Sequence, residues 1–115
     1  MDSRQMTRIA VEALEDKKAG DITIIDISAI SVMADYFVIA SASSANQTEA
    51  LMDSVDEKLV KAGVKGGQTE GVKTSGWVLM DYGDLIVHIF DKENRLFYDL
   101  ERIWKDGKVI DRQSL

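Results

Sequence analysis

Apolar residues recur every three or four positions near the start of the chain. Within residues 3–18 this spacing places one set of apolar side chains on a single helix face, namely Met6, Ile9, Ala10, Ala13 and Leu14. Ser3 is expected to cap the start of this helix. Lys17, Lys18 and Gly20 are typical of its end. The pattern predicts an amphipathic helix over residues 3–18.

Two apolar runs of strand length follow the predicted helix. Residues 21–27 are rich in β-branched side chains, which favour strands. Residues 36–40 are apolar throughout, as expected for a strand that is covered on both faces. Residues 28–34 lie between the two runs and are predicted to form a connecting loop.

A second helical pattern begins near Asn46, after a stretch of small residues at 41–45. Ser44 and Gln47 match the capping box, in which each side chain bonds the backbone of the other residue. Gly63 is expected to end the helix. Its buried stripe is predicted to contain Ala50, Leu51, Val55 and Leu59.

The second half of the chain contains loop, hairpin and helix signals. Residues 63–76 hold five of the eight glycines and are predicted to be loop with a short edge strand at 68–70. Residues 77–81 and 85–90 are two strand patterns joined by Tyr82-Gly83-Asp84, which indicates a hairpin. A last helix is predicted over residues 92–104, with Leu96, Leu100, Ile103 and Trp104 as its apolar face.

The order of these elements is helix, two strands, helix, short strand, hairpin and helix. It predicts an α+β fold, an α/β sandwich with a mixed sheet and flanking helices. The chain has 115 residues, which fit a single domain spanning residues 1–115. We see no repeat, low-complexity segment or interdomain linker in it.

Charge argues against tight binding to a nucleic-acid backbone. The net charge is −6, and Lys and Arg are scattered along the chain without forming a basic stripe. Little direct nucleic-acid binding is therefore expected, although an acidic protein can reach a nucleoprotein particle by docking on one of its basic proteins. The alternative is that the acidity only keeps the protein in solution.

Composition also limits the chemistry and the location of the protein. There is no cysteine and only one histidine, so disulfides and thiolate catalysis are ruled out and a zinc site is not expected. No metal or cofactor is predicted. No apolar run approaches the roughly twenty residues that span a membrane, and residues 1–5 do not resemble a signal or transit peptide. The cytoplasm is the predicted location.

The sequence gives little support for a hydrolytic active site or a phosphate-binding loop. His88 lies among apolar residues in a strand pattern, where a histidine is more often part of the sheet than a general base, and no serine has a G-x-S-x-G context. Gly66-Gly67 and Gly71 lack the Lys-Ser/Thr ending of a phosphate-binding loop. Residues 41–47 allow two interpretations, an anion site at a helix N-terminus or a Ser44 cap.

Nucleotidyl transfer needs two carboxylates that project from one face of a strand onto Mg²⁺. The candidate pairs lie across a turn, in the first turn of a helix or within a helix, and they are Asp81/Asp84, Asp91/Glu93 and Asp99/Glu101. None has the required arrangement. We therefore expect that the protein is not an enzyme.

Aromatic residues are concentrated in the last third of the chain. Six of the eight lie there, namely Trp77, Tyr82, Phe90, Phe97, Tyr98 and Trp104. Such an excess is found both in cores and on protein-interaction surfaces. Composition does not choose between these two roles.

Four segments and one single residue carry a further signal, in order along the chain: residues 34–41, Gln47, residues 70–71, residues 77–90 and residues 95–104. Together they closely resemble the ribosomal silencing factor (Iojap) family. The stretch from Trp77 to Phe90 is long enough to be highly specific. The chain differs at Ala42, where many relatives have glycine, which affects the loop before the second helix and no expected contact.

The resemblance implies a nucleotidyltransferase-like fold without the catalytic carboxylates. It also implies that the protein binds the large ribosomal subunit through its L14-type protein. Bound there, it would block subunit joining and repress translation when nutrients are short. Family members are often dimers when free, so the resemblance implies a homodimer. A nucleotidyltransferase-like enzyme and a generic protein-binding adaptor remain the alternatives.

The expected contact surface is the 77–90 hairpin. Alternation along a strand places Trp77, Leu79 and Asp81 on one face and Val78 and Met80 on the other. We predict that the residues that contact the partner or support the contact are Trp77, Asp81, Tyr82, Asp84 and His88, with Tyr98 and Glu101 at the flank. For Trp77 and His88 a role in the core stays open.

Overall fold

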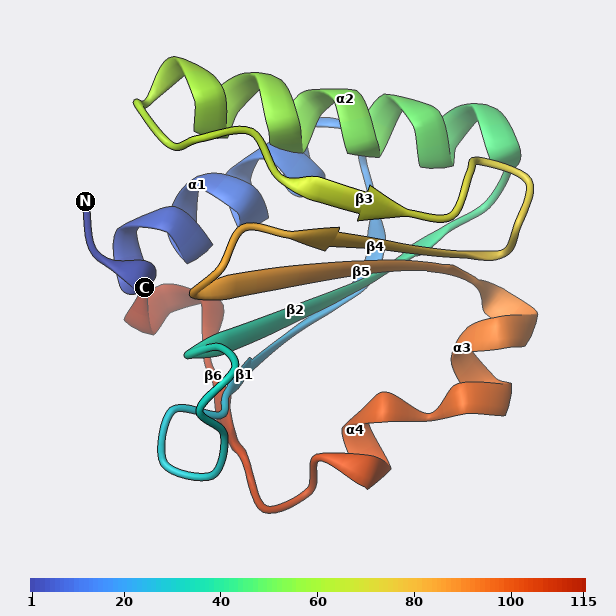
Figure 1. Cartoon of the computed structure of the whole chain (residues 1–115). Helices are drawn as coiled ribbons and strands as arrows, with labels where there is room; N and C mark the ends of the chain where they lie inside the picture. Colours follow the sequence, from blue (N-terminus) through green and yellow to red (C-terminus); the bar gives the residue numbers. More distant parts are fainter.

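Six strands form one mixed sheet in the computed structural model, which describes residues 1–115 (Figure 1). The strand order is β3-β4-β5-β2-β1-β6. The strands are β1 (Gly20–Asp26), β2 (Tyr36–Ala42), β3 (Gln68–Glu70), β4 (Trp77–Asp81), β5 (Leu85–Asp91) and β6 (Lys108–Ile110). The helices are α1 (Ser3–Asp16), α2 (Ala45–Lys61), α3 (Lys92–Tyr98), α4 (Leu100–Ile103) and the short 3₁₀ helix η1 (Arg112–Ser114). The α+β prediction is confirmed.

The centre of the sheet is the parallel pair β2 and β5, in which Val38 lies opposite Val87. All other neighbouring strands are antiparallel. Every residue of β2 is buried, which confirms that this strand is covered on both faces. No helix of the structure combines the length and apolar character needed to cross a bilayer.

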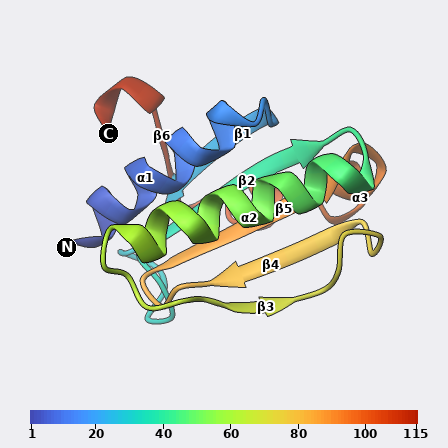
Figure 2. The same cartoon turned by 90° about the horizontal axis from the view of Figure 1, so that it is seen from above.

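Helices α1 and α2 lie side by side over one face of the sheet, which we call the helix face (Figure 2). Their apolar stripes pack on alternate strand residues and form the larger of two buried clusters. Leu14, Leu51 and Leu59 are fully buried there against Val38 and Val87. The two helices therefore cover one face of the sheet and leave the opposite face to other segments.

The opposite face, called the second face, is covered in part. After β5 the chain turns back beneath the sheet, so that α3 and α4 lie under it (Figure 1). A smaller buried cluster forms here from Ile25, Ile27, Ala34, Phe37, Ile39, Ile86, Phe90 and Leu100. Trp104 adds to it by meeting the Phe37 ring edge-on, with 5.0 Å between centroids. Trp77 and Leu79 of β4 pack only at the margin of this cluster.

The prediction of one continuous helix over residues 92–104 was wrong, because this segment forms two helices, α3 and α4. Asp99 adopts a left-handed conformation (φ 46°, ψ 58°) that ends α3 and starts the turn into α4. The break lets Leu100 and Trp104 reach the second face, while Leu96 and Ile103 of the predicted apolar face are left exposed. Aspartate tolerates this conformation better than most residues because its short side chain is polar.

The helix starts also differ from expectation. Asp2, not Ser3, caps α1, because its side chain accepts the Gln5 N–H and Gln5 bonds back to the Asp2 N–H. Ser44 caps α2 as predicted by accepting the Gln47 N–H. The reciprocal bond of the capping box is missing there, since Gln47 Oε1 accepts from the Ser43 N–H and hydroxyl instead of the Ser44 N–H. Gln47 Nε2 donates to the carbonyls of Lys17 and Lys18.

Candidate protein-docking surface

The β4–β5 hairpin presents alternate residues to the two faces, as predicted. Val78 and Met80 are buried under α1 and α2 on the helix face. Trp77 and Leu79 lie on the second face and are half-buried, and Asp81 is exposed. The hairpin therefore contributes side chains to the least covered part of the second face.

Trp77 is both packed and accessible. Its ring is stacked on Phe90 with centroids 5.1 Å apart, and it lies 4.6 Å from the ring of Tyr98. Its indole Nε1–H donates to Nδ1 of His88 over 3.2 Å. These contacts leave the residue half-buried, so Trp77 belongs to both the margin of the core and the surface.

His88 is only 3% exposed and therefore has no direct access to a partner. Its Nδ1 accepts the Trp77 proton, which places the proton of the neutral imidazole on Nε2. That Nε2 is buried without a hydrogen-bond partner. Burial lowers the pKa of His88 to about 4, so the ring is neutral near pH 7. The hydrogen bond to His88 therefore holds the Trp77 indole in its orientation.

The apolar surface continues from Trp77 onto α3. The Tyr98 ring is met edge-on by Phe97, with 5.1 Å between centroids, and Phe97 is 81% exposed. A cavity of about 250 Å³ lies beside Trp77 and is lined by Glu70, Gly71, Trp77 and Leu79. We call Trp77, Leu79, Phe97 and Tyr98 the aromatic surface.

Phe97 and Leu79 were not among the predicted contact residues. The expected continuous helix assigned its core-facing stripe through Leu96, which left Phe97 without a role. The only sequence signal for Phe97 was the concentration of aromatics in the last third of the chain. Leu79 was placed on the correct face but was not singled out.

Two predicted acidic contacts lie at the other end of the hairpin. Asp81 and Asp84 are both exposed. Asp81 lies about 13 Å along β4 from Trp77 if each residue adds roughly 3.3 Å, and Asp84 lies in the turn that follows. Gly83 between them has φ +86°, and its N–H donates to Asp81 Oδ1 over 2.8 Å. The turn therefore fixes these carboxylates at the surface, apart from the aromatic surface.

Tyr82 is directed toward the helix layer and not toward the aromatic surface. Its hydroxyl donates to Asp56 Oδ1 of α2 over 2.8 Å. Its ring lies over Gly67, where an added Cβ would come within 2.8 Å of the ring. Burial, together with the Asp56 carboxylate, raises the pKa of Tyr82 above its usual range. Tyr82 is thus a brace between the hairpin turn and α2.

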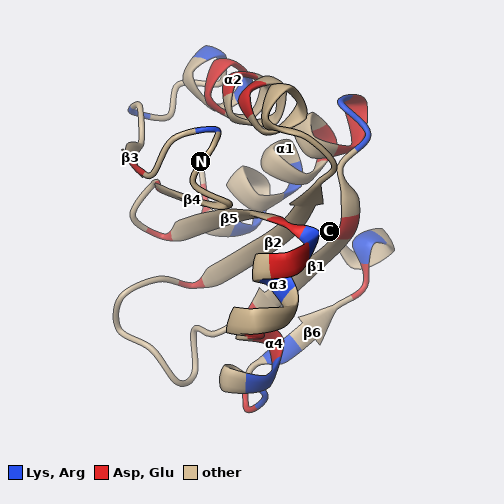
Figure 3. Cartoon of the chain, turned by 90° about the vertical axis from the view of Figure 1, so that its right-hand side faces the viewer, with Lys and Arg blue, Asp and Glu red and all other residues tan.

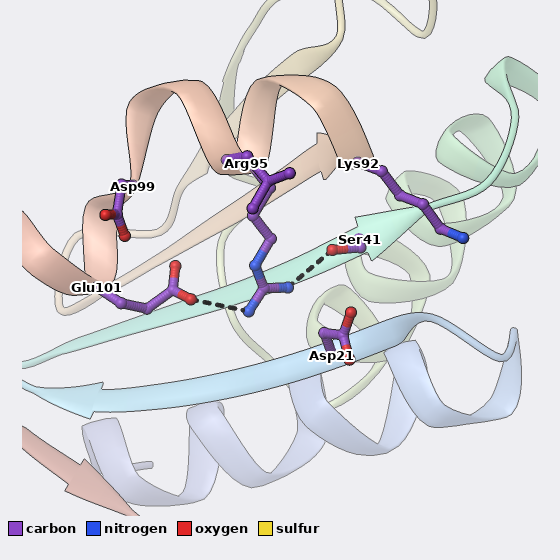
Figure 4. A pocket seen from close by; sticks show the side chains of 7 residues that line it. Asp21, Ser41, Lys92, Arg95, Asp99 and Glu101 are labelled. Atoms are coloured by element: carbon purple, nitrogen blue, oxygen red, sulfur yellow. Dashed lines mark hydrogen bonds and ion pairs between the residues drawn. The ribbon is translucent and has the colours of Figure 1, made fainter.

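Glu101 belongs to a polar cluster around Arg95 (Figure 4). The Arg95 guanidinium donates to Ser41 Oγ over 2.8 Å, to Thr23 Oγ1 over 3.0 Å and to Glu101 over 3.2 Å. A cavity of about 410 Å³ is open beside it. Arg95 thereby ties α3 and α4 to strands β1 and β2, and so fixes the helix segment that carries Phe97 and Tyr98.

Replacing Arg95 with methionine is expected to lower the free energy of unfolding by about 2 kcal/mol, because the charged hydrogen bonds to Ser41 and Thr23 are lost. Urea denaturation of both proteins measures this change. Lys92→Met is the matched control, since Lys92 lies in the same cavity wall but is exposed and makes no ion pair. Equal stability of the Arg95 variant and the wild type would contradict the role of Arg95.

The remaining site candidates keep structural roles. Ser44 is engaged in capping α2, and Ser41 is buried and bonded to Arg95. Asp91 caps α3 by accepting the Asn94 N–H. No group of three or more His, Asp or Glu is placed to hold a metal ion. Basic and acidic residues are interspersed along α2, α3 and α4 (Figure 3).

Comparison with known proteins decides the family. A family model described as "Ribosomal silencing factor during starvation" matches residues 1–115. The chain belongs to the ribosomal silencing factor family. Within this family, the ribosomal silencing factor of Bacillus subtilis is 36% identical over 111 residues, which cover 96% of this chain and 94% of that protein.

Two further relatives extend the comparison. The chloroplastic protein Iojap of Arabidopsis thaliana is 30% identical over 113 residues, covering 96% of this chain and 47% of that longer protein. A crystal structure from Chromobacterium violaceum superimposes with a TM-score of 0.87 at 37% identity, over 91% of this chain and 88% of that one. The resemblance to the silencing factor and Iojap family is confirmed. The family name describes a regulatory role.

Proposed function

We propose that this protein binds the large ribosomal subunit through its L14-type protein and keeps the small subunit from joining. The observation that carries the proposal is the aromatic surface, in which half-buried Trp77 and Leu79 of the hairpin adjoin exposed Phe97 and Tyr98 of α3. The chain that carries it belongs to the silencing factor family. Exposed aromatic residues beside charged groups are typical anchors of protein interfaces. The resemblance supplies the identity of the partner.

Charge complementarity supports a basic protein as the direct partner. The chain has a net charge of −6, which disfavours contact with the phosphates of ribosomal RNA. Asp81 and Asp84 are exposed at one end of the hairpin and form no salt bridge within the chain. Such carboxylates favour a partner surface with lysine and arginine side chains. Trp77 and Phe97 would then supply the apolar anchors.

The proposed mechanism is steric. The molecule measures 33 × 33 × 25 Å, and α1 and α2 lie on the sheet face opposite the aromatic surface. If the aromatic surface docks on the large subunit, the two helices project away from it. They occupy space that the small subunit needs, and no covalent bond is made or broken. Repression under nutrient limitation and a homodimer in the free state belong to the same proposal.

Co-sedimentation with purified large subunits tests the binding step. We expect the protein to pellet with large subunits, and to bind the isolated L14-type protein in a pull-down. Migration with small subunits alone would contradict the proposal. Binding of the protein to large subunits without contact between the protein and the L14-type protein would contradict the choice of partner.

Phe97→Ser is expected to weaken binding to large subunits about tenfold or more, because an exposed aromatic anchor is lost. The melting temperature should change little, since the Phe97 ring is mostly in solvent. Val60→Ser is the matched control, because Val60 is an exposed apolar residue of α2 on the helix face. Unchanged affinity of the Phe97 variant would exclude α3 from the interface.

A further inference from the structure

The loop between β1 and β2 presents apolar side chains to solvent. Val32 is fully exposed, Met33 is 74% exposed and Ile30 is 45% exposed. Single exposed apolar residues are common, but three within four positions at a loop tip form a patch, and such patches mark interaction sites. The packing of the fold does not explain them, because none contributes to either buried cluster.

The loop is held in a fixed shape by its own hydrogen bonds. The Ile27 N–H donates to the Asp35 carbonyl over 2.8 Å and closes the base of the loop. The N–H groups of Ile30 and Ser31 both donate to the Ile27 carbonyl, over 3.0 and 2.9 Å. The Met33 N–H donates to Ser31 Oγ over 3.0 Å. An ordered loop loses less entropy on binding than a mobile one.

Carboxylates without ion partners lie at the base of this loop and on the hairpin turn joined to it. The backbone N–H groups of Asp35 and Tyr36 both donate to the Asp84 carbonyl, so the loop is joined directly to the hairpin turn. Asp35 and Asp84 form no salt bridge, and neither do Asp26 and Asp81 nearby. The adjoining basic residues are Lys108, opposite Asp26 in the sheet, and Lys65, in a cavity wall with Asp81.

We propose that the 28–35 loop and the 81–84 turn form a second docking surface, the acidic loop surface, for a Lys/Arg-rich segment of a large-subunit protein. This inference rests on the proposed binding to the large subunit. Apolar side chains of the segment pack on Val32 and Met33, while its basic groups pair with Asp35 and Asp84. At this acidic surface, like charge disfavours RNA, anionic membranes and the same surface of a second copy as occupants.

The position of the acidic loop surface relative to the aromatic surface is expected to raise the affinity for the large subunit. Asp81 and Asp84 belong to the same hairpin as Trp77, so the acidic loop surface and the aromatic surface lie at the two ends of β4. A rigid sheet fixes the distance between them. Two anchored contacts on one particle bind more tightly than either alone, because the second contact forms at a high effective concentration.

Paired variants separate the apolar and the charged contributions. The double variant Val32→Ser/Met33→Ser is expected to bind large subunits about tenfold more weakly in co-sedimentation. Asp35→Asn/Asp84→Asn is expected to bind about fivefold more weakly at low salt and to lose much of the salt dependence of the wild type. Val60→Ser again serves as control. All the changed side chains are exposed or lack bonds of their own, so thermal melting should show folded proteins.

Photo-crosslinking identifies the occupant. A p-benzoylphenylalanine in place of Val32, in complex with large subunits, is expected to crosslink to a ribosomal protein at a Lys/Arg-rich segment. The same group in place of Phe97 monitors the aromatic surface. Crosslinks from position 32 to RNA alone, to a second copy alone, or to nothing while position 97 reacts would overturn this inference and leave the proposed function standing. Absence of binding by the wild type would overturn both.

Discussion

Trp77→Ala is expected to lower the free energy of unfolding by about 3 kcal/mol, because a half-buried ring that is stacked on Phe90 is removed. The same change should weaken binding to large subunits about thirtyfold. Both effects are expected because the residue is half-buried, so it packs on Phe90 and Tyr98 and is also accessible to a partner. Urea denaturation and co-sedimentation of the same variant measure them.

Trp77→Phe separates the two roles of this residue. Phenylalanine keeps an aromatic ring on Phe90 but lacks the indole N–H that donates to His88. We expect it to retain most of the stability and to lose part of the affinity. Binding should be measured well below the melting temperature of each variant, so that only folded protein is compared. A stable Trp77→Ala protein with wild-type affinity would remove Trp77 from both core and interface.

Acid is expected to destabilise the protein through His88. Its pKa is about 4 in the folded protein and 6.5 when unperturbed, because burial disfavours the charged imidazolium. Between these values the unfolded chain binds the proton and the folded chain does not. The contribution of neutral His88 is therefore fully present above pH 6.5 and is lost as the pH falls toward 4. The loss should be about 3 kcal/mol.

A comparison with His88→Gln isolates this effect from the titration of carboxylates. The stability difference between wild type and variant should shrink by about 3 kcal/mol between roughly pH 7 and pH 4. Chemical denaturation across this range measures the difference, and NMR titration of the single histidine reports its pKa directly. A difference that stays constant with pH, or a His88 pKa near 6.5, would contradict the burial of His88 beside Trp77.

The strands could be predicted because their signals are local. The run Tyr36–Ala40 is wholly apolar and became the central strand, which is buried on both faces. The glycine of the Tyr82-Gly83-Asp84 turn marked the hairpin, and even the short edge strand β3 has its predicted bounds. Alternation along β4 then assigned Trp77 to the correct face.

The last third of the chain could not be predicted in the same way. Helical periodicity favoured one helix over residues 92–104, but tertiary packing of Leu100 and Trp104 and the Arg95 bonds to β1 and β2 require a break at Asp99. Strand β6 was missed because a run of only three residues, Lys108–Ile110, is too short to show the alternation of a strand.

The positions of the predicted contact residues could be foreseen only in part, for similar reasons, and their contact with a partner stays a prediction. The hairpin was found because its residue pattern is specific, and the structure places Trp77, Asp81 and Asp84 at or near the surface. The direction of Tyr82 depends on a close approach to Gly67, which lies on a different segment, so its contact with Asp56 was not foreseeable. The exposed loop tip at Val32 also escaped prediction, since a short apolar loop has no characteristic period.

Subunit joining measured by light scattering tests the central claim most directly. Purified large subunits are incubated with the protein, small subunits are added, and the rise in scattering as intact ribosomes form is followed over time. We predict that saturating wild-type protein suppresses the rise and that the Phe97→Ser variant restores it at the same concentration. An undiminished rise with large subunits that demonstrably carry the wild-type protein would contradict the account.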